Sequence, residues 1–158
     1  MDRSFLRIYH LLCVLVLVFL IANEGFSQAI NINGGNITLT ITTGMPDVQQ
    51  LTSVTNSTCT MQYRRQARIS KITVAATCPG QSFNLSVVAT NITISGTAQP
   101  TVSLISGNPA MDFIRDNSTA GARRSCTLNY TASATFAQGC STNVGNDVYT
   151  VTYTLVVQ

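Results

Sequence analysis

The clearest strand pattern in the sequence is Tyr-Thr-Val-Thr-Tyr-Thr-Leu, residues 149–155. Apolar or aromatic side chains alternate with threonines, so one face of an extended chain is apolar and the other is polar. The same period of two recurs in residues 36–42 and 83–87. β-branched residues suit the pleated surface of a sheet, and no segment after residue 29 keeps a helical period. These patterns predict an all-β protein.

In the rest of the mature chain, alternation and turn residues extend this pattern to about eight predicted strands. The strands are expected at residues 36–43, 58–66, 69–77, 82–89, 91–95, 101–105, 126–136 and 148–157. Turn sequences such as Gly44-Met45-Pro46 and Gly107-Asn108-Pro109 separate them. Short strands spaced in this way favour an immunoglobulin-like β-sandwich of about 7–8 strands, with a barrel as the alternative.

Residues 1–29 have the features of a secretory signal peptide. Two arginines make the start positive, an apolar run occupies residues 11–22, and Ser27-Gln28-Ala29 offers small residues at a cleavage site. The apolar run is short of the ~20 residues that cross a bilayer. We therefore expect a secreted or cell-surface protein whose mature chain, residues 30–158, forms one domain with no membrane contact after cleavage.

The mature chain carries little charge. Removal of residues 1–29 takes away two of the nine basic residues, two of the six acidic residues and the single histidine, which leaves seven basic residues and four aspartates. This is too weak a basic excess for a nucleic-acid surface. A nucleophile would need a base that only Lys71 or an aspartate could supply. Asp112 and Asp116 could hold calcium or act on a sugar bond, but we interpret them as part of a solvated loop. We expect no enzyme activity, cofactor or metal site.

The mature chain has four cysteines, Cys59, Cys78, Cys126 and Cys140. An even number in an oxidising compartment favours two disulfides, and three connectivities are open. A hairpin of residues 59–66 and 69–78 would place Cys59 opposite Cys78. We therefore expect the pairs 59–78 and 126–140.

Two five-residue segments resemble each other: Cys-Thr-Met-Gln-Tyr at residues 59–63 and Cys-Thr-Leu-Asn-Tyr at residues 126–130. The likeness indicates an internal duplication or chance. If the segments are neighbours, nearby arginines would form one basic patch, which could contact an acidic polysaccharide or a neighbouring subunit, or simply keep the surface soluble. These arginines are Arg64, Arg65, Arg68, Arg123 and Arg124.

Six Asn-x-Ser/Thr sequons are candidate glycosylation sites, at Asn36, Asn56, Asn84, Asn91, Asn117 and Asn129. Such sequons carry glycans only in a host that has the required enzymes. Otherwise they reflect a surface rich in asparagine and threonine.

The start of the mature chain indicates how subunits could join. Ile30 and Ile32 alternate ahead of an Asn33-Gly34-Gly35 hinge. A detachable strand of this kind can add to the open sheet edge of a neighbour through backbone hydrogen bonds and apolar side chains. Three stretches also resemble bacterial pilin and fibre subunits: Gly34-Gly35-Asn36-Ile37-Thr38, Ala134-Thr135-Phe136 and the closing strand from Asp147 to Tyr153.

The pattern and the resemblance imply a non-catalytic subunit of an extracellular filament or surface layer that polymerises with itself. Residues 30–43 would be the donor strand. The side chains that enter the neighbour's core would be Ile30, Ile32, Ile37, Leu39 and Ile41. The alternative is a secreted glycan-binding or adhesion module, which the absence of tryptophan disfavours.

Overall fold

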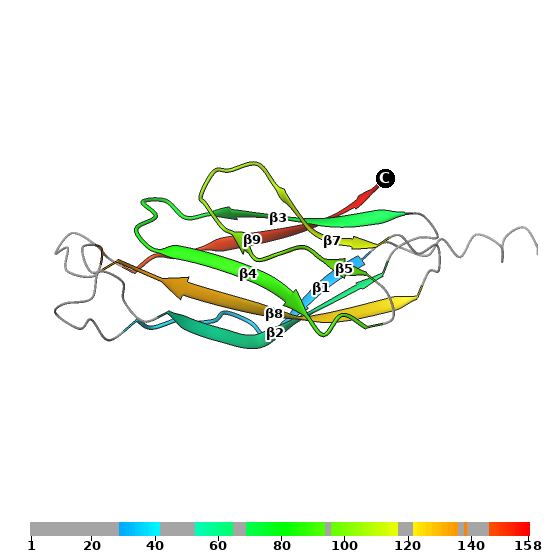
Figure 1. Ribbon diagram of the computed structural model, residues 1–158, viewed down its shortest axis with the longest axis horizontal. Coiled ribbons are helices and arrows are strands. Elements are labelled where there is room, and N and C mark those ends of the chain that lie inside the picture. The colour runs from blue at the N-terminus through cyan, green and yellow to red at the C-terminus, as the bar shows by residue number, and fades with distance from the viewer. Residues whose placement is uncertain are drawn as a thin grey trace, which may run out of the picture.

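The computed structural model of the protein describes residues 29–41, 53–64, 69–93, 96–116, 122–135, 138 and 146–158. Over these residues the chain forms two antiparallel sheets that face each other (Figure 1). The prediction of an all-β protein is therefore confirmed, and the arrangement is consistent with a β-sandwich.

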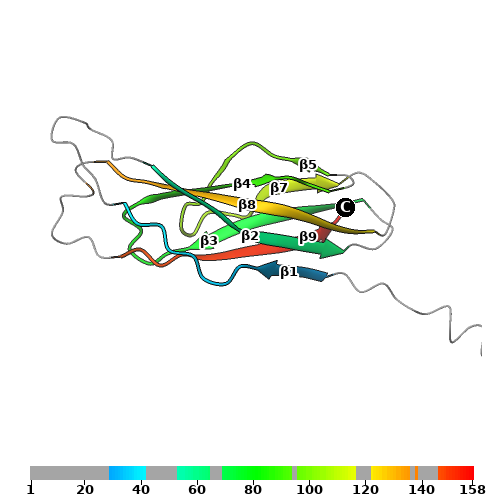
Figure 2. The same ribbon diagram turned by 90° about the horizontal axis from the view of Figure 1, so that it is seen from below.

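The five-stranded sheet consists of β1 (Ala29–Asn33), β2 (Val54–Arg64), β8 (Arg123–Ser133), β4 (Asn84–Thr90) and β6 (Val102–Ser103), in that spatial order. The four-stranded sheet consists of β5 (Thr97–Ala98), β7 (Met111–Asp116), β3 (Ser70–Thr77) and β9 (Thr150–Val157), again in spatial order. β1 and β9 are edge strands of different sheets and lie on the same flank of the molecule (Figure 2).

The core lies between the sheets and is built from alternate residues of the strands. In β8, every second side chain from Arg124 to Ala132 is buried, and those between them are half-buried on the outer face. Phe113 and Leu128 are completely buried. Full burial of such a side chain contributes roughly 1.5–3 kcal/mol. The period of two in the sequence thus places apolar residues between the sheets.

The predicted hairpin of residues 59–66 and 69–78 is wrong. β2 pairs with β1 and β8, whereas β3 pairs with β7 and β9 in the other sheet. Alternation determines which side chains face the core, but it does not identify the partner strand. Cys59 and Cys78 therefore do not lie opposite each other, and both are free, buried thiols. The second expected pair lies partly outside the described residues, because Cys140 is among those not described.

Other strand predictions also need correction. Residues 36–41 alternate in burial but form no strand, and residues 91–93 form none. The rest of those two predicted strands lies outside the described residues. The strand predicted at 101–105 is reduced to the two residues of β6. In contrast, β7 occupies a segment that the sequence analysis interpreted as a solvated loop.

Candidate functional site

The N-terminal segment of the described chain, residues 29–41, is the candidate site because it forms an edge of the molecule. β1 pairs with the C-terminal half of β2, from Ala29 opposite Arg64 to Asn33 opposite Thr60. The other side of β2 pairs with β8. β1 thus covers an edge of β2 that would otherwise present unpaired backbone groups.

A close contact fixes the end of β1 on β2. Gly34 has a φ of +124° and lies so close to Cys59 that an added Cβ would stand 2.8 Å from both the Cα and the Sγ of Cys59. The Cys59 thiol also donates a long hydrogen bond of 3.9 Å to the carbonyl of Gly35. Only glycine fits this position without strain, so Gly34 packs directly against Cys59.

The residues after the hinge cover the flank of the sandwich. Ile37, Leu39 and Ile41 are half-buried against the core, and the residues between them are exposed. On the other side of this flank, the side chains of Tyr153 and Leu155 in β9 are also half-buried. The flank is therefore partly covered and apolar.

The structure brings the five predicted donor residues together on this flank. Ile30, Ile37, Leu39 and Ile41 pack against the core of their own chain. Ile32 lies on the same strand but is 40% exposed. In a single chain these side chains therefore contact their own sandwich, and the predicted contact with a neighbour stays a prediction.

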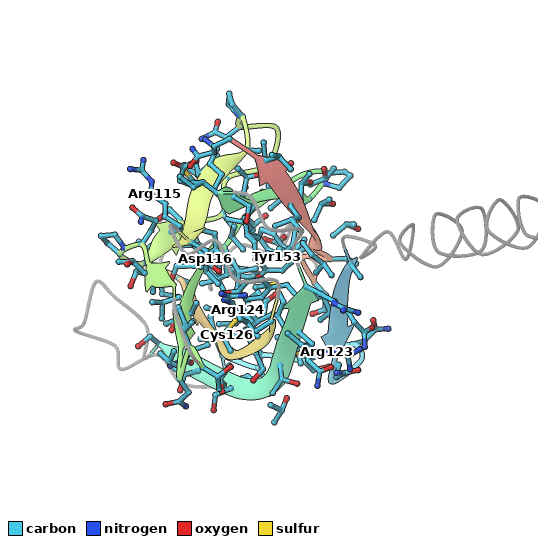
Figure 3. All side chains as sticks on the ribbon, turned by 90° about the vertical axis from the view of Figure 1, so that its right-hand side faces the viewer. Arg115, Asp116, Arg123, Arg124, Cys126 and Tyr153 are labelled. Carbon is cyan, nitrogen blue, oxygen red and sulfur yellow. The ribbon has the colours of Figure 1, made fainter. Side chains whose placement is uncertain are left out.

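The basic patch forms only in part. The two Cys-Thr-x-x-Tyr segments are neighbours, because β2 and β8 pair with Thr60 opposite Thr127, and this places Arg64 opposite Arg123 at one end of the sheet. Arg124 does not join them. As Figure 3 shows, Arg124 lies between the sheets, whereas Arg123 points outward. The remaining two residues of the predicted patch, Arg65 and Arg68, lie outside the described residues.

Arg124 forms a buried ion pair between the two sheets. Its Nε lies 2.7 Å from Oδ2 of Asp116, and the two side chains are 0% and 3% exposed. Arg124 also donates a hydrogen bond to the carbonyl of Ala122. Because Asp116 is in β7 and Arg124 is in β8, the pair connects the two layers of the fold.

Asp112 and Asp116 do not form a carboxylate pair. β7 has a bulge at Phe113, because Ile114 and Asp112 pair with consecutive residues of β3. The extra residue turns the two aspartates to opposite faces of the sheet. Asp112 instead binds Lys71 at 2.7 Å and Arg115 at 2.8 Å, and these hydrogen bonds lower the pKa of the Asp112 carboxyl. The interpretation of this segment as a solvated loop is wrong.

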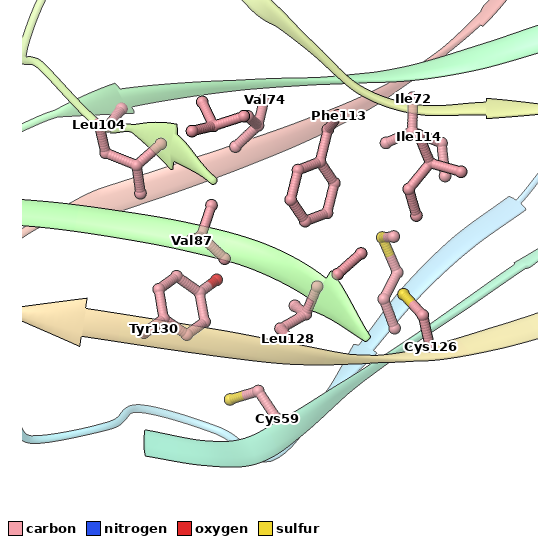
Figure 4. Packing of buried hydrophobic residues seen from close by; sticks show 14 of the residues in the cluster. Cys59, Ile72, Val74, Val87, Leu104, Phe113, Ile114, Cys126, Leu128 and Tyr130 are labelled. Atoms are coloured by element: carbon pink, nitrogen blue, oxygen red, sulfur yellow. The ribbon is translucent and has the colours of Figure 1, made fainter. Parts of the chain in front are cut away.

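The core contains the thiols of Cys59 and Cys126 and the ring of Tyr130 (Figure 4). The hydroxyls of Tyr130 and Tyr153 lie 2.8 Å apart. Burial raises the pKa of both phenols and raises the pKa of the Cys126 thiol to about 11. A thiol with so high a pKa is almost fully protonated at neutral pH and is a poor nucleophile. The cluster is suited to packing.

Asp147 fixes the chain just before β4, a role that was not predicted from the sequence. Its Oδ2 accepts hydrogen bonds of 2.8 Å from the backbone amides of Ser82 and Phe83. The Tyr149 hydroxyl donates to the Phe83 carbonyl, and the Gln138 amide donates to the Ser82 carbonyl. A lone aspartate before a strand gives no signal of these contacts, because its partners lie more than sixty residues away.

The sequons lie on different parts of the surface. Asn36, Asn84 and Asn91 are exposed, and Asn56 and Asn129 are half-buried. Asn117 lies outside the described residues.

Among the described residues, no helix is long and apolar enough to cross a membrane. No three histidine, cysteine or acidic side chains in this part of the chain gather as metal ligands. The predicted signal peptide, apart from Ala29, lies outside the described residues. No family model, curated protein or solved structure matches the chain.

Proposed function

We propose that the protein is a non-catalytic subunit of an extracellular filament or surface layer, with an immunoglobulin-like sandwich, and that its subunits join by exchange of the N-terminal strand. The observation that carries the proposal is the position of residues 29–41 and the partial exposure of their apolar side chains. These residues consist of the edge strand β1, the two hinge glycines at positions 34 and 35, and an extended stretch after them, and their isoleucine and leucine side chains are half-buried or, at Ile32, 40% exposed. An apolar edge strand of this kind is a template for pairing between chains.

The flank beside this segment supports the proposal. β9 pairs with β3 along one side, and among the described residues no strand pairs with its other side. Val157, at the end of β9, is 39% exposed. Two sheet edges with partly exposed apolar side chains thus share one flank, which is suited to subunit contacts.

The roles of the charged groups support a structural rather than a catalytic function. Asp112 binds two partly exposed cations, Asp116 forms a buried ion pair, and Asp147 binds two backbone amides. Each of these carboxylates holds the fold together. None lies within a pair suited to acid–base chemistry in the described part of the chain.

The test is removal of residues 30–43. If this segment joins subunits, the truncated protein should stay folded, or nearly so, and should not polymerise. A synthetic peptide of residues 30–43 should bind it and produce a stable monomer. Circular dichroism and size-exclusion chromatography distinguish the outcomes. Filaments formed by the truncated protein would contradict the proposal.

A second candidate function is a glycan-binding module. The observation that favours it is the outer face of the five-stranded sheet, where Ser125, Thr127 and Asn129 form a polar row and Arg123 faces Arg64 at its end. Hydroxyl, amide and guanidinium groups can bind an acidic polysaccharide. Salt-dependent binding of polygalacturonate by the monomer, lost in Arg123→Ala, would favour this function.

A further inference from the structure

We propose that residues 29–41 of one subunit dock on β2 of the next subunit in the same register that they adopt within a single chain. This inference rests on the proposed function and names its partner, which is a second copy of the chain. The acceptor is the backbone edge of Thr60–Arg64, together with Cys59 and the apolar flank beside it.

The first reason is that this edge already binds an N-terminal strand. All five residues of β1 have partners in β2, from Ala29 opposite Arg64 to Asn33 opposite Thr60. If the segment leaves, the backbone of these β2 residues loses its partners on that side. A second copy carries the same strand, so it can restore every hydrogen bond of this ladder.

The second reason is that the contact at Cys59 selects one register. Position 34 has no room for a Cβ, since that atom would lie 2.8 Å from the Cα and Sγ of Cys59. A shift of the donor by two residues would keep its inward face but would place Ile32 or Asn36 at this point. Neither side chain fits there. A donor from any subunit must therefore present Gly34 to Cys59.

The third reason is that the residues after the hinge are bound to the sandwich mainly by half-buried isoleucine and leucine side chains, so they can detach and bind again. Ile37, Leu39 and Ile41 pack on the core without joining a strand. The segment therefore has fewer backbone bonds to release than a central strand. Residues 42–52, which follow it, are eleven residues long, and a chain of that length can span at most roughly 36–40 Å. This reach allows the segment to extend to an adjacent subunit.

Because the same contacts can form within one chain or between two chains, protein concentration should determine whether the subunits are linked. The segment within the chain acts as a ligand at an effective concentration on the order of millimolar. Dilute protein should therefore stay closed, with β1 on its own β2. Concentrated or newly exported chains should exchange their segments and form linked subunits.

The test uses two variants of the full chain, Asn31→Cys and Gln62→Cys. Asn31 is exposed, Gln62 lies on the same outer face, and the two residues are direct partners across β1 and β2. Direct partners have Cβ atoms about 4.5–5.5 Å apart. Neither variant alone can form this cross-link within one chain. The two are co-expressed, oxidised, and mapped by mass spectrometry of the joined peptides.

We expect a disulfide between residue 31 of one chain and residue 62 of the other, in filaments or oligomers. A matched control replaces Gln62→Cys by Ser133→Cys, which lies at the far end of the same sheet and should give no such cross-link. A third pairing, Asn31→Cys with Thr152→Cys, probes β9 as the acceptor.

The outcomes separate the two proposals. Filaments in which residue 31 cross-links to residue 152 and not to residue 62 would overturn the β2 acceptor and leave strand exchange standing. Filaments without either cross-link would also overturn the inferred register. A protein that forms no oligomers at high concentration would overturn both this inference and the proposed function.

Discussion

Removal of one partner of the buried ion pair between Asp116 and Arg124 should destabilise the protein strongly. The two side chains are 3% and 0% exposed, and the Oδ2–Nε distance is 2.7 Å. Asp116→Asn removes the negative charge beside the buried guanidinium of Arg124. Breaking a buried pair in this way costs about 3–5 kcal/mol. A domain of this size has a total stability of roughly 5–15 kcal/mol, so the loss is a large fraction of the whole.

The assay is urea denaturation followed by circular dichroism, with the free energy of unfolding compared between variants. Asp112→Asn is the matched control, because Asp112 lies in the same strand and its ion pairs with Lys71 and Arg115 are partly exposed. Exposed ion pairs contribute up to about 1 kcal/mol. An Asp116→Asn variant as stable as the Asp112→Asn control would refute the reasoning.

Replacement of both partners gives a second check on the same pair. Asp116→Leu with Arg124→Met removes both charges of this pair, and apolar side chains of similar size take their place. Buried pairs replaced in this way often lose little stability or none. We therefore expect the double variant to be more stable than Asp116→Asn. A double variant that is less stable than Asp116→Asn would show that the pair stabilises the fold by more than the neutralisation of each charge by the other.

Three further predictions follow from the core and the hinge. Burial raises the pKa of Tyr153, so this side chain stays protonated in the folded protein when the same tyrosine in the unfolded chain ionises near pH 10. The free energy of unfolding should therefore fall by about 1.4 kcal/mol per pH unit above pH 10. Tyr153→Phe should reduce this slope in urea titrations at pH 9 to 11. Gly34→Ala should lower the melting temperature more than Gly35→Ala, because an added Cβ meets Cys59 only at position 34; equal effects would contradict the close contact. Cys59 and Cys126 are buried and free, so a thiol reagent should modify them only in denaturant, and rapid labelling of the native protein or a mapped 59–78 disulfide would contradict this.

Local patterns in the sequence predicted the strands whose side chains alternate. β3 was expected at residues 69–77 and is found at Ser70–Thr77. β9 was expected at 148–157 and is found at Thr150–Val157. In β9, Val151, Tyr153 and Leu155 pack against the core and the threonines between them are exposed, so the period of two is visible in the sequence.

The same patterns could not predict β7 or the sheet partners. In β7 the bulge at Phe113 breaks the alternation, and two aspartates and an arginine make the segment resemble a loop. The groups that neutralise the aspartates, Lys71 and Arg124, are in other strands. Strand pairing likewise depends on contacts between distant segments. The hairpin of residues 59–66 and 69–78 was therefore predicted from proximity in sequence, although the two strands belong to different sheets.

The residues of the candidate site were chosen from the sequence, but their setting in the fold was not predicted. The alternation of Ile30 and Ile32 and the glycines after Asn33 indicated a detachable strand. The sequence did not reveal that this strand covers the edge of its own β2. Nor did it reveal the contact between Gly34 and Cys59, because a close approach of two backbones leaves no pattern beyond the glycine itself.

The central claim is that the protein is a filament subunit, and electron microscopy of the purified native protein tests it most directly. The account predicts linear filaments at high concentration, with single particles on dilution. The control is the protein lacking residues 30–43, which should give only single particles under the same conditions. Single particles of the intact protein at every concentration would contradict the account.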